Sequence, residues 1–191
     1  MDLSGNSSPE KIRELFLIGC YTGLRYSDYS TLTTDKIKGG FIRGIQIKTG
    51  DPVTIPLHDA VIRILKKYPN GLPKSSSNQK TNKYLKDVGK EIPRLKAEIE
   101  KQFAKAGEKK RVKFKKWELL TTHTARRSLA TNALLESTPT LTIMAITGHK
   151  TEKAFLKYKK LSSADYAKLL KEQWALRKKK SSPAKSAKSN D

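Results

Sequence analysis

The chain has 191 residues, and its 40 Lys and Arg against 18 Asp and Glu leave a formal net charge of +22. This charge predicts a polyanion as partner and favours contact with a phosphate backbone over contact with a membrane surface. The single cysteine, Cys20, excludes an intramolecular disulfide and most cysteine-based zinc sites, and no apolar run approaches the ~18 residues of a membrane span. We therefore expect a soluble, intracellular protein with no membrane partner.

The first predicted element is a helix. Ser8-Pro9-Glu10 combines a capping serine, a first-turn proline and an acid, which is typical of a helix start. Gly23 is expected to end this helix, and a second, short helical segment is expected over 26–32. Arg25 then lies at the junction between two helices. Residues 1–8 are expected to form a polar leader ahead of the folded domain.

The apolar period then changes to two. Alternation over 45–48 and again over 53–57, with a turn over 49–52, predicts a small β-hairpin that carries Lys48 near its tip. A helix follows, with Asp59 as its candidate cap.

The middle of the chain is ambiguous. Residues 85–92 have helical spacing that Pro93 ends or kinks. The basic segment 95–114 fits the spacing of a helix and of a strand. Gly107, between Phe103 and Val112, favours a second β-hairpin.

Short helices are predicted for the last third of the chain. Thr122 is the candidate cap of a helix through Leu135, and a helix over 141–146 is expected to end near Gly148. Thr151 caps the next helix, which carries Phe155 and Tyr158.

A last amphipathic helix spans about 164–178, with Trp174 on its apolar side. Residues 179–191 are of low complexity and are expected to be a disordered basic tail.

Several side chains suit chemistry on a phosphodiester. Such chemistry needs a nucleophile, positive charge at two phosphate oxygens and a proton for the leaving hydroxyl. Arg25 and Arg126 are candidates for the charge, because a guanidinium binds phosphate through two parallel hydrogen bonds. Tyr158 is a candidate nucleophile and His123 its candidate base, since a phenol must lose its proton before it attacks. Each residue taken alone also fits a structural role.

Metal binding is the alternative for the histidines. His123 and His149 lie far apart in the chain, and only His58 and Cys20 remain as further soft ligands. We therefore expect no metal and no other cofactor.

Five landmarks taken together carry a resemblance. They are Thr22-Gly23-Leu24-Arg25, Lys48-Thr49-Gly50, His123-Thr124-Ala125-Arg126-Arg127-Ser128, Thr147-Gly148-His149-Lys150 and Tyr158. In this order they resemble the catalytic domain of the tyrosine recombinases, the phage integrase family, over roughly residues 9–165. The last segments look most similar to integrases of Bacteroidetes mobile elements.

The resemblance implies a fold and a set of roles. The fold would be α+β and mostly helical, with a small antiparallel β-sheet on one side, in a catalytic domain over 9–178. Arg25 and Arg126 would clamp the scissile phosphate, and Tyr158 would attack it to give a 3′-phosphotyrosyl link without ATP or metal. Lys48 would protonate the leaving oxygen. His123 would assist as a base, and His149 would hydrogen-bond the phosphate.

Two further implications concern single positions. Asp28 stands where the family usually carries Glu, and is expected to orient Arg25 through a contact that does not itself touch the phosphate. Nothing before Ser8 could form the DNA-clamping domain that usually precedes this one, so we expect a catalytic fragment.

The expected partner is double-stranded DNA in the bacterial cytoplasm, at the nucleoid. The fragment alone is expected to be monomeric, and the full-length protein to form a DNA-bound tetramer in which the terminal helix docks in cis or on a neighbour. Two alternatives stay open. One is a type IB topoisomerase-like enzyme that only nicks and closes DNA, and the other is a noncatalytic basic nucleic-acid-binding protein.

Overall fold

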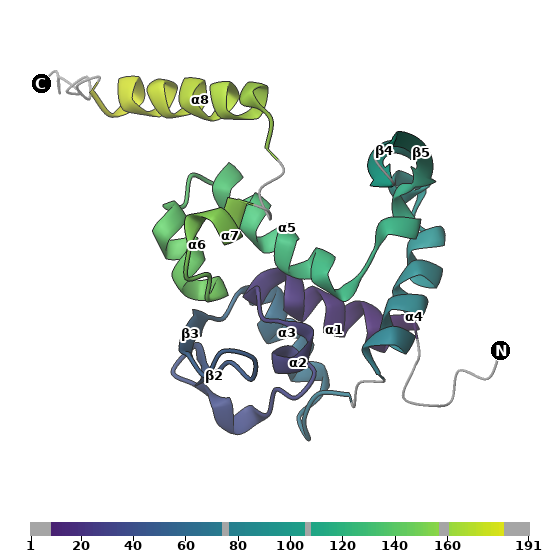
Figure 1. The fold of residues 1–191 in the computed structure, drawn as a ribbon. Helices are drawn as coiled ribbons and strands as arrows, with labels where there is room; N and C mark the ends of the chain where they lie inside the picture. The colour runs from purple at the N-terminus through teal and green to yellow at the C-terminus, as the bar shows by residue number, and fades with distance from the viewer. Residues whose placement is uncertain (1–8, 74–76, 106–107, 157–160, 182–191) are drawn as a thin grey trace, which may run out of the picture.

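The structure is a computed structural model that describes residues 9–73, 77–105, 108–156 and 161–181. Helices dominate it, and two small antiparallel sheets lie on different sides (Figure 1). At the centre, α1 (Pro9–Thr22) packs against α3 (Asp59–Lys67), α4 (Asn78–Lys90) and α5 (Thr122–Leu135). The predicted α+β, mostly helical class is confirmed.

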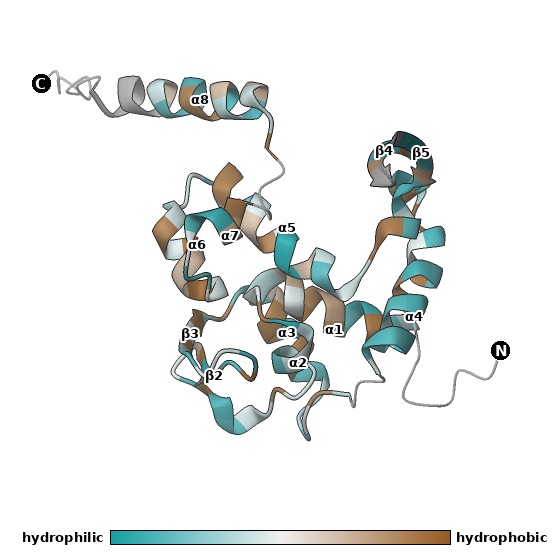
Figure 2. Cartoon of the chain, viewed as in Figure 1, coloured by the Kyte–Doolittle hydropathy of each residue, from teal (hydrophilic) through white to brown (hydrophobic). Residues whose placement is uncertain are grey.

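The main core lies between α1, α3 and the first sheet. Ile12, Leu15 and Ile18 recur at helical spacing on α1 and are 0–2% exposed. Leu15 and Ile18 share a cluster with Val61 of α3 and Ile55 of the sheet, and Figure 2 shows this apolar centre in brown. The helix that carries Gly23 at its end is therefore anchored along its length.

The first sheet has the strand order β1 (Ile37–Lys38), β2 (Phe41–Ile45) and β3 (Pro52–Pro56). Ile42 pairs with Ile55, and both side chains are buried. The 3-10 turn η1 (Thr34–Lys36) precedes β1. The predicted hairpin with Lys48 near its tip is confirmed, because Lys48 lies in the loop between β2 and β3.

The alternation is inverted at the end of β2. Ile45 and Ile47 are 70% and 63% exposed, whereas Gln46 between them is 2% exposed. The ladder stops at Ile45, and the Gln46 carbonyl accepts from the backbone N–H of Gly50 at 2.8 Å. A tight turn has therefore replaced the strand here, and it brings the polar side chain inward.

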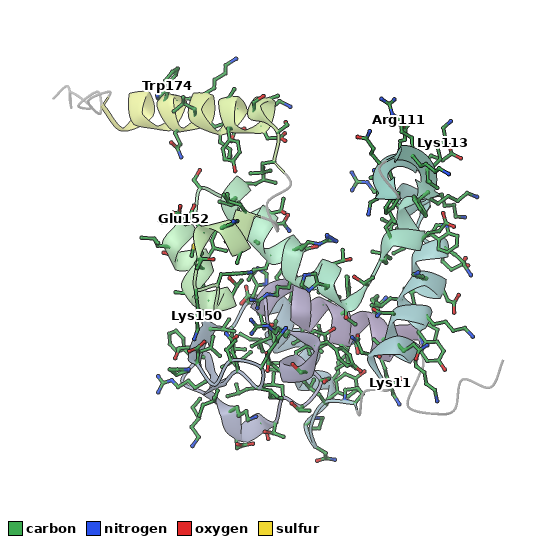
Figure 3. The ribbon with its side chains drawn as sticks, viewed as in Figure 1. Lys11, Arg111, Lys113, Lys150, Glu152 and Trp174 are labelled. Carbon is green, nitrogen blue, oxygen red and sulfur yellow. The ribbon has the colours of Figure 1, made fainter. Side chains whose placement is uncertain are left out.

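The second hairpin is also confirmed. Strands β4 (Glu98–Lys105) and β5 (Glu108–Lys115) pair with Ile99 opposite Phe114. Together with α4 they project to one side of the molecule (Figure 1), and Arg111 and Lys113 point away from its body (Figure 3). The 3-10 turns η2 (Pro93–Leu95) and η3 (Lys116–Leu119) flank the hairpin.

Two helices start one residue away from their predicted caps. The cap of α5 is Thr121, in a reciprocal capping box with Thr124, rather than Thr122. The cap of α3 is His58, whose Nδ1 accepts from the Ala60 N–H at 3.1 Å. Neighbouring side chains can cap equally well, and the backbone decides, since the capping residue must be extended.

A smaller core lies under α6 (Thr140–Thr147) and α7 (Glu152–Leu156), where Leu134, Ile143 and Phe155 are buried together. Beyond it, α8 (Ser163–Ser181) lies apart from the body (Figure 1) and carries a hydrogen bond at 3.1 Å from Gln173 Nε2 to Ser137 Oγ. Trp174 is 56% exposed and points away from the other helices (Figure 3). None of the described helices is long and apolar enough to cross a membrane.

Candidate active site

Four of the six candidate residues line one pocket. Arg25, Lys48, His123 and Arg126 border a cavity of about 330 Å³, and they come from the α1–α2 junction, the β2–β3 loop and α5. The other lining residues are Leu24, Tyr26, Ser27, Asn78 and Thr122. His149 is not among the lining residues, but it lies two residues after Thr147, whose carbonyl accepts a hydrogen bond from Arg126. Tyr158 lies outside the described residues.

Arg126 is held in place by two neutral acceptors. Its side chain is 2% exposed, and its Nη1 donates to the carbonyl of Gly23 at 2.6 Å while its Nη2 donates to the carbonyl of Thr147. These carbonyls end α1 and α6, where helix dipoles place partial negative charge. These two contacts fix the guanidinium, and neither acceptor carries a formal charge.

Gly23 has the conformation that this contact needs. Its φ of +66° lies in the left-handed region, and a Cβ would overlap the side chain of Leu129. The Thr22-Gly23-Leu24-Arg25 motif thus ends α1, presents a carbonyl to Arg126 and starts α2 (Tyr26–Tyr29) at Arg25.

Arg25 is half-buried, and its Nη1 donates to Oε1 of Gln46. Asp28 makes no side-chain hydrogen bond to Arg25 in the described structure. Its Oδ1 accepts from the backbone N–H of Ile47 at 2.9 Å, so this carboxylate holds the loop before Lys48. The direct contact to Arg25 comes from Gln46, which no sequence motif singled out.

Lys48 itself is exposed at the loop tip. The loop is tied at both ends, by the Asp28 contact to Ile47 and by an ion pair at 3.2 Å between Asp51 and Lys150. Lys150 follows His149 directly, so this ion pair joins the Lys48 loop to the segment that carries His149.

His149 is set by the end of α6. Gly148 caps α6 with a φ of +65°, and His149 Nδ1 lies 2.7 Å from Oγ1 of Thr147. That hydroxyl donates to the Ile143 carbonyl at 2.6 Å, so it accepts from an N–H at Nδ1. The imidazole packs edge-on against Phe155 at 5.5 Å.

Both imidazoles are held neutral. Burial, and then the charges of Arg126 and Arg25, lower the pKa of His149 to about 4. Burial, followed by Arg127, Arg126 and Arg25, also lowers the pKa of His123. A pocket with this excess of positive charge is suited to an anion.

The chain matches the Phage integrase family over residues 1–164. It belongs to this family. No curated protein matches it.

Solved structures share the fold of this family member. The catalytic domain of bacteriophage HP1 integrase matches with a TM-score of 0.50 at 19% identity, over 76% of this chain and 71% of that chain. A XerH site-specific recombinase bound to palindromic difH substrate matches with a TM-score of 0.59 at 14% identity, over 93% of this chain and 48% of that chain. A lambda integrase dimer bound to a core site matches with a TM-score of 0.55 at 19% identity, over 80% of this chain and 53% of that chain. The chain thus spans about half the length of the last two.

Within the described part of this phage integrase family member, no three His, Cys, Asp or Glu side chains are grouped so that they could hold a metal ion.

Replacing His149 with glutamine is expected to flatten the acid limb of the stability curve. The pKa of His149 is about 4 in the folded protein against an ordinary 6.5, so the unfolded chain binds more protons between these values. Stability is therefore lost as pH falls through this window. The melting temperature of His149→Gln should fall less between about pH 6.5 and about pH 4.5 than that of wild type.

The same replacement of His58, at the start of α3 outside the pocket, is the control. An acid limb as steep in His149→Gln as in wild type would contradict the proposed neutrality of the ring.

Proposed function

We propose that the chain is the catalytic domain of a site-specific DNA recombinase that cuts and rejoins DNA through a phosphotyrosine. The observation that carries this proposal is the convergence of two guanidiniums, an ammonium and an imidazole on one pocket of a phage integrase family member. We assign residues 9–178 to the catalytic domain, 1–8 to a leader and 179–191 to a basic tail.

Arg25 and Arg126 bind the scissile phosphate. Both are oriented by neutral oxygens, of Gln46 in one case and of two backbone carbonyls in the other, and these acceptors do not themselves neutralise the guanidinium charges. Preorganised charge of this kind stabilises the negative charge that develops as the phosphorus is attacked.

Tyr158 supplies the nucleophile. Its phenolic oxygen bonds to phosphorus as the bond to the 5′ oxygen breaks, and Lys48 gives that oxygen its proton, leaving a 3′-phosphotyrosyl link and a free 5′-hydroxyl. The assignment of Tyr158 is supported by Phe155, three residues earlier in the chain. Phe155 is buried and packs on the ring of His149, so the chain leading to Tyr158 passes beside this histidine. Attack by a 5′-hydroxyl of the exchanged strand reverses these steps, so neither ATP nor metal is consumed.

His123 takes the proton of Tyr158, because its lowered pKa keeps the ring neutral and able to accept. His149 has the opposite task. Its Nδ1–H is held by Thr147, which leaves Nε2 as the acceptor nitrogen. A phosphate bound between the arginines offsets their charge and raises the pKa of His149, so that Nε2 takes a proton and donates it in a hydrogen bond to the phosphate.

The partner is double-stranded DNA, reached in the bacterial cytoplasm at the nucleoid, and the net charge of +22 supplies sequence-independent affinity. We also propose that the chain comes from an integrase of a Bacteroidetes mobile element, on the resemblance of its last motifs. Full-length protein assembles as a DNA-bound tetramer, and the exposed Trp174 of α8 favours docking of this helix on a neighbour.

Strand exchange separates this function from its two alternatives. Two duplexes that carry the element's joined ends and a target site, each labelled with its own dye, are expected to yield a product with both dyes. A nicking-closing enzyme would relax supercoiled plasmid but give no doubly labelled product. A noncatalytic binding protein would do neither, and either outcome would contradict the proposal.

A further inference from the structure

We propose that Gln46 is a positioning residue whose buried, uncharged amide holds Arg25, the Lys48 loop and the His149 turn in one arrangement. The inference rests on the proposed function for its effect on catalysis, but the arrangement itself is independent of that function. The side chain of Gln46 contacts Arg25, Thr49 of the Lys48 loop and the turn at Gly148.

The burial of Gln46 is the first observation. Its side chain is 2% exposed, although the two neighbouring isoleucines are largely exposed. Burying an amide while apolar side chains face water is unfavourable unless the amide is hydrogen-bonded. The local apolar preference is therefore overridden by the contacts that this amide makes.

The contact to Arg25 is the second observation. Oε1 of Gln46 accepts from Nη1 of Arg25, and Thr49 Oγ1 approaches the same oxygen at 3.4 Å. Arg25 makes one side-chain hydrogen bond in the described structure, and its acceptor is uncharged, while the Asp51 carboxylate interacts with the guanidinium only through its charge. A carboxylate here would hold the guanidinium as well, but it would compete with the phosphate for it.

The backbone of Gln46 shapes the Lys48 loop. Its N–H donates to the Asp51 carbonyl at 2.9 Å, and its carbonyl accepts from the N–H groups of Thr49 and Gly50 at 3.3 and 2.8 Å. The same residue that fixes Arg25 thus closes the loop that carries the proposed proton donor.

The turn before His149 packs on the other side of the amide. A Cβ added to Gly148 would overlap the Gln46 side chain, with its amide carbon at only 2.8 Å, so glycine is the residue that permits this approach. Moving the amide would therefore displace Arg25, the Lys48 loop and the His149 turn together, whereas each could otherwise shift separately.

The side-chain NMR signals of Arg25 test the positioning without DNA. In wild type, the hydrogen bond should slow rotation about the Cζ–Nη1 bond and give resolved Nη signals. Gln46→Leu should average them, Gln46→Glu should keep them resolved, and Arg126 should be unchanged in both variants. Resolved Arg25 signals in Gln46→Leu would overturn the positioning role.

Relaxation of supercoiled plasmid by the full chain tests the consequence. In Gln46→Leu the maximal rate should fall by roughly ten- to a hundredfold while the half-saturating DNA concentration changes little, because bulk affinity comes from net charge. Gln46→Glu should be at least as slow although it keeps Arg25 fixed, since it cancels the charge. Ile55→Val, a core change in the same sheet, controls for stability.

The outcomes separate cleanly. A Gln46→Glu variant with the wild-type rate would overturn the requirement for an uncharged partner, and a Gln46→Leu rate equal to that of Ile55→Val would overturn the catalytic effect. If wild type itself failed to relax plasmid or to exchange strands, the proposed function would fall while the NMR result still decided the positioning.

Discussion

Replacing Arg126 with alanine is expected to abolish strand cleavage and to lower the free energy of unfolding by about 2–6 kcal/mol. The stability loss follows from the burial of the site. The carbonyls of Gly23 and Thr147 would both lose their partner, and each unsatisfied buried acceptor costs about 1–3 kcal/mol. The activity loss follows from removing a charge that the ends of α1 and α6 hold ready for a phosphate.

Arg126→Lys separates the two effects. An ammonium on a shorter side chain cannot bond both carbonyls and present a planar fork to phosphate, so a substantial part of both losses should remain. Chemical denaturation and the yield of covalent adduct measure them. Arg63→Ala, at an exposed position on α3, is the control and should change stability by less than about 0.5 kcal/mol. Wild-type stability in Arg126→Ala would contradict the double carbonyl contact.

The parts of the fold that the sequence predicted are those with a local cause. Gly23 and Gly148 end helices because each has a positive φ, and both stops were read from glycine alone. The hairpin over 98–115 was expected from Gly107, which lies between Phe103 and Val112. The direction in which this hairpin projects (Figure 1) could not be predicted, because it depends on the placement of α4 and not on a local turn signal.

The candidate pocket was predicted in its residues but not in its supports. The resemblance of the motifs to those of the tyrosine recombinases selected the four residues that line it. Gln46 and Asp28 act through contacts to segments 21 and 19 residues away in the chain, and nothing local distinguishes such a residue from an ordinary polar one. The one available signal was a glutamine inside an apolar alternation, which the period rule assigns to the surface.

Replacing Tyr158 with phenylalanine is expected to have the largest effect on catalysis. The change removes one oxygen and leaves the ring, so DNA affinity and folding should stay close to those of wild type. Covalent capture of DNA needs that oxygen, and loss of a nucleophile lowers the rate by at least about a thousandfold. Tyr84→Phe, on α4, is the matched control and should keep full adduct formation.

The most direct measurement uses a duplex with a nick beside the attachment site, which traps the covalent intermediate because the short cut strand diffuses away. Wild-type protein should give a denaturation-resistant adduct, and mass spectrometry after proteolysis should find the nucleotide on Tyr158. Tyr158→Phe should give none at equal occupancy of the DNA. An adduct that persists in Tyr158→Phe, or one attached to another residue, would contradict the proposed mechanism.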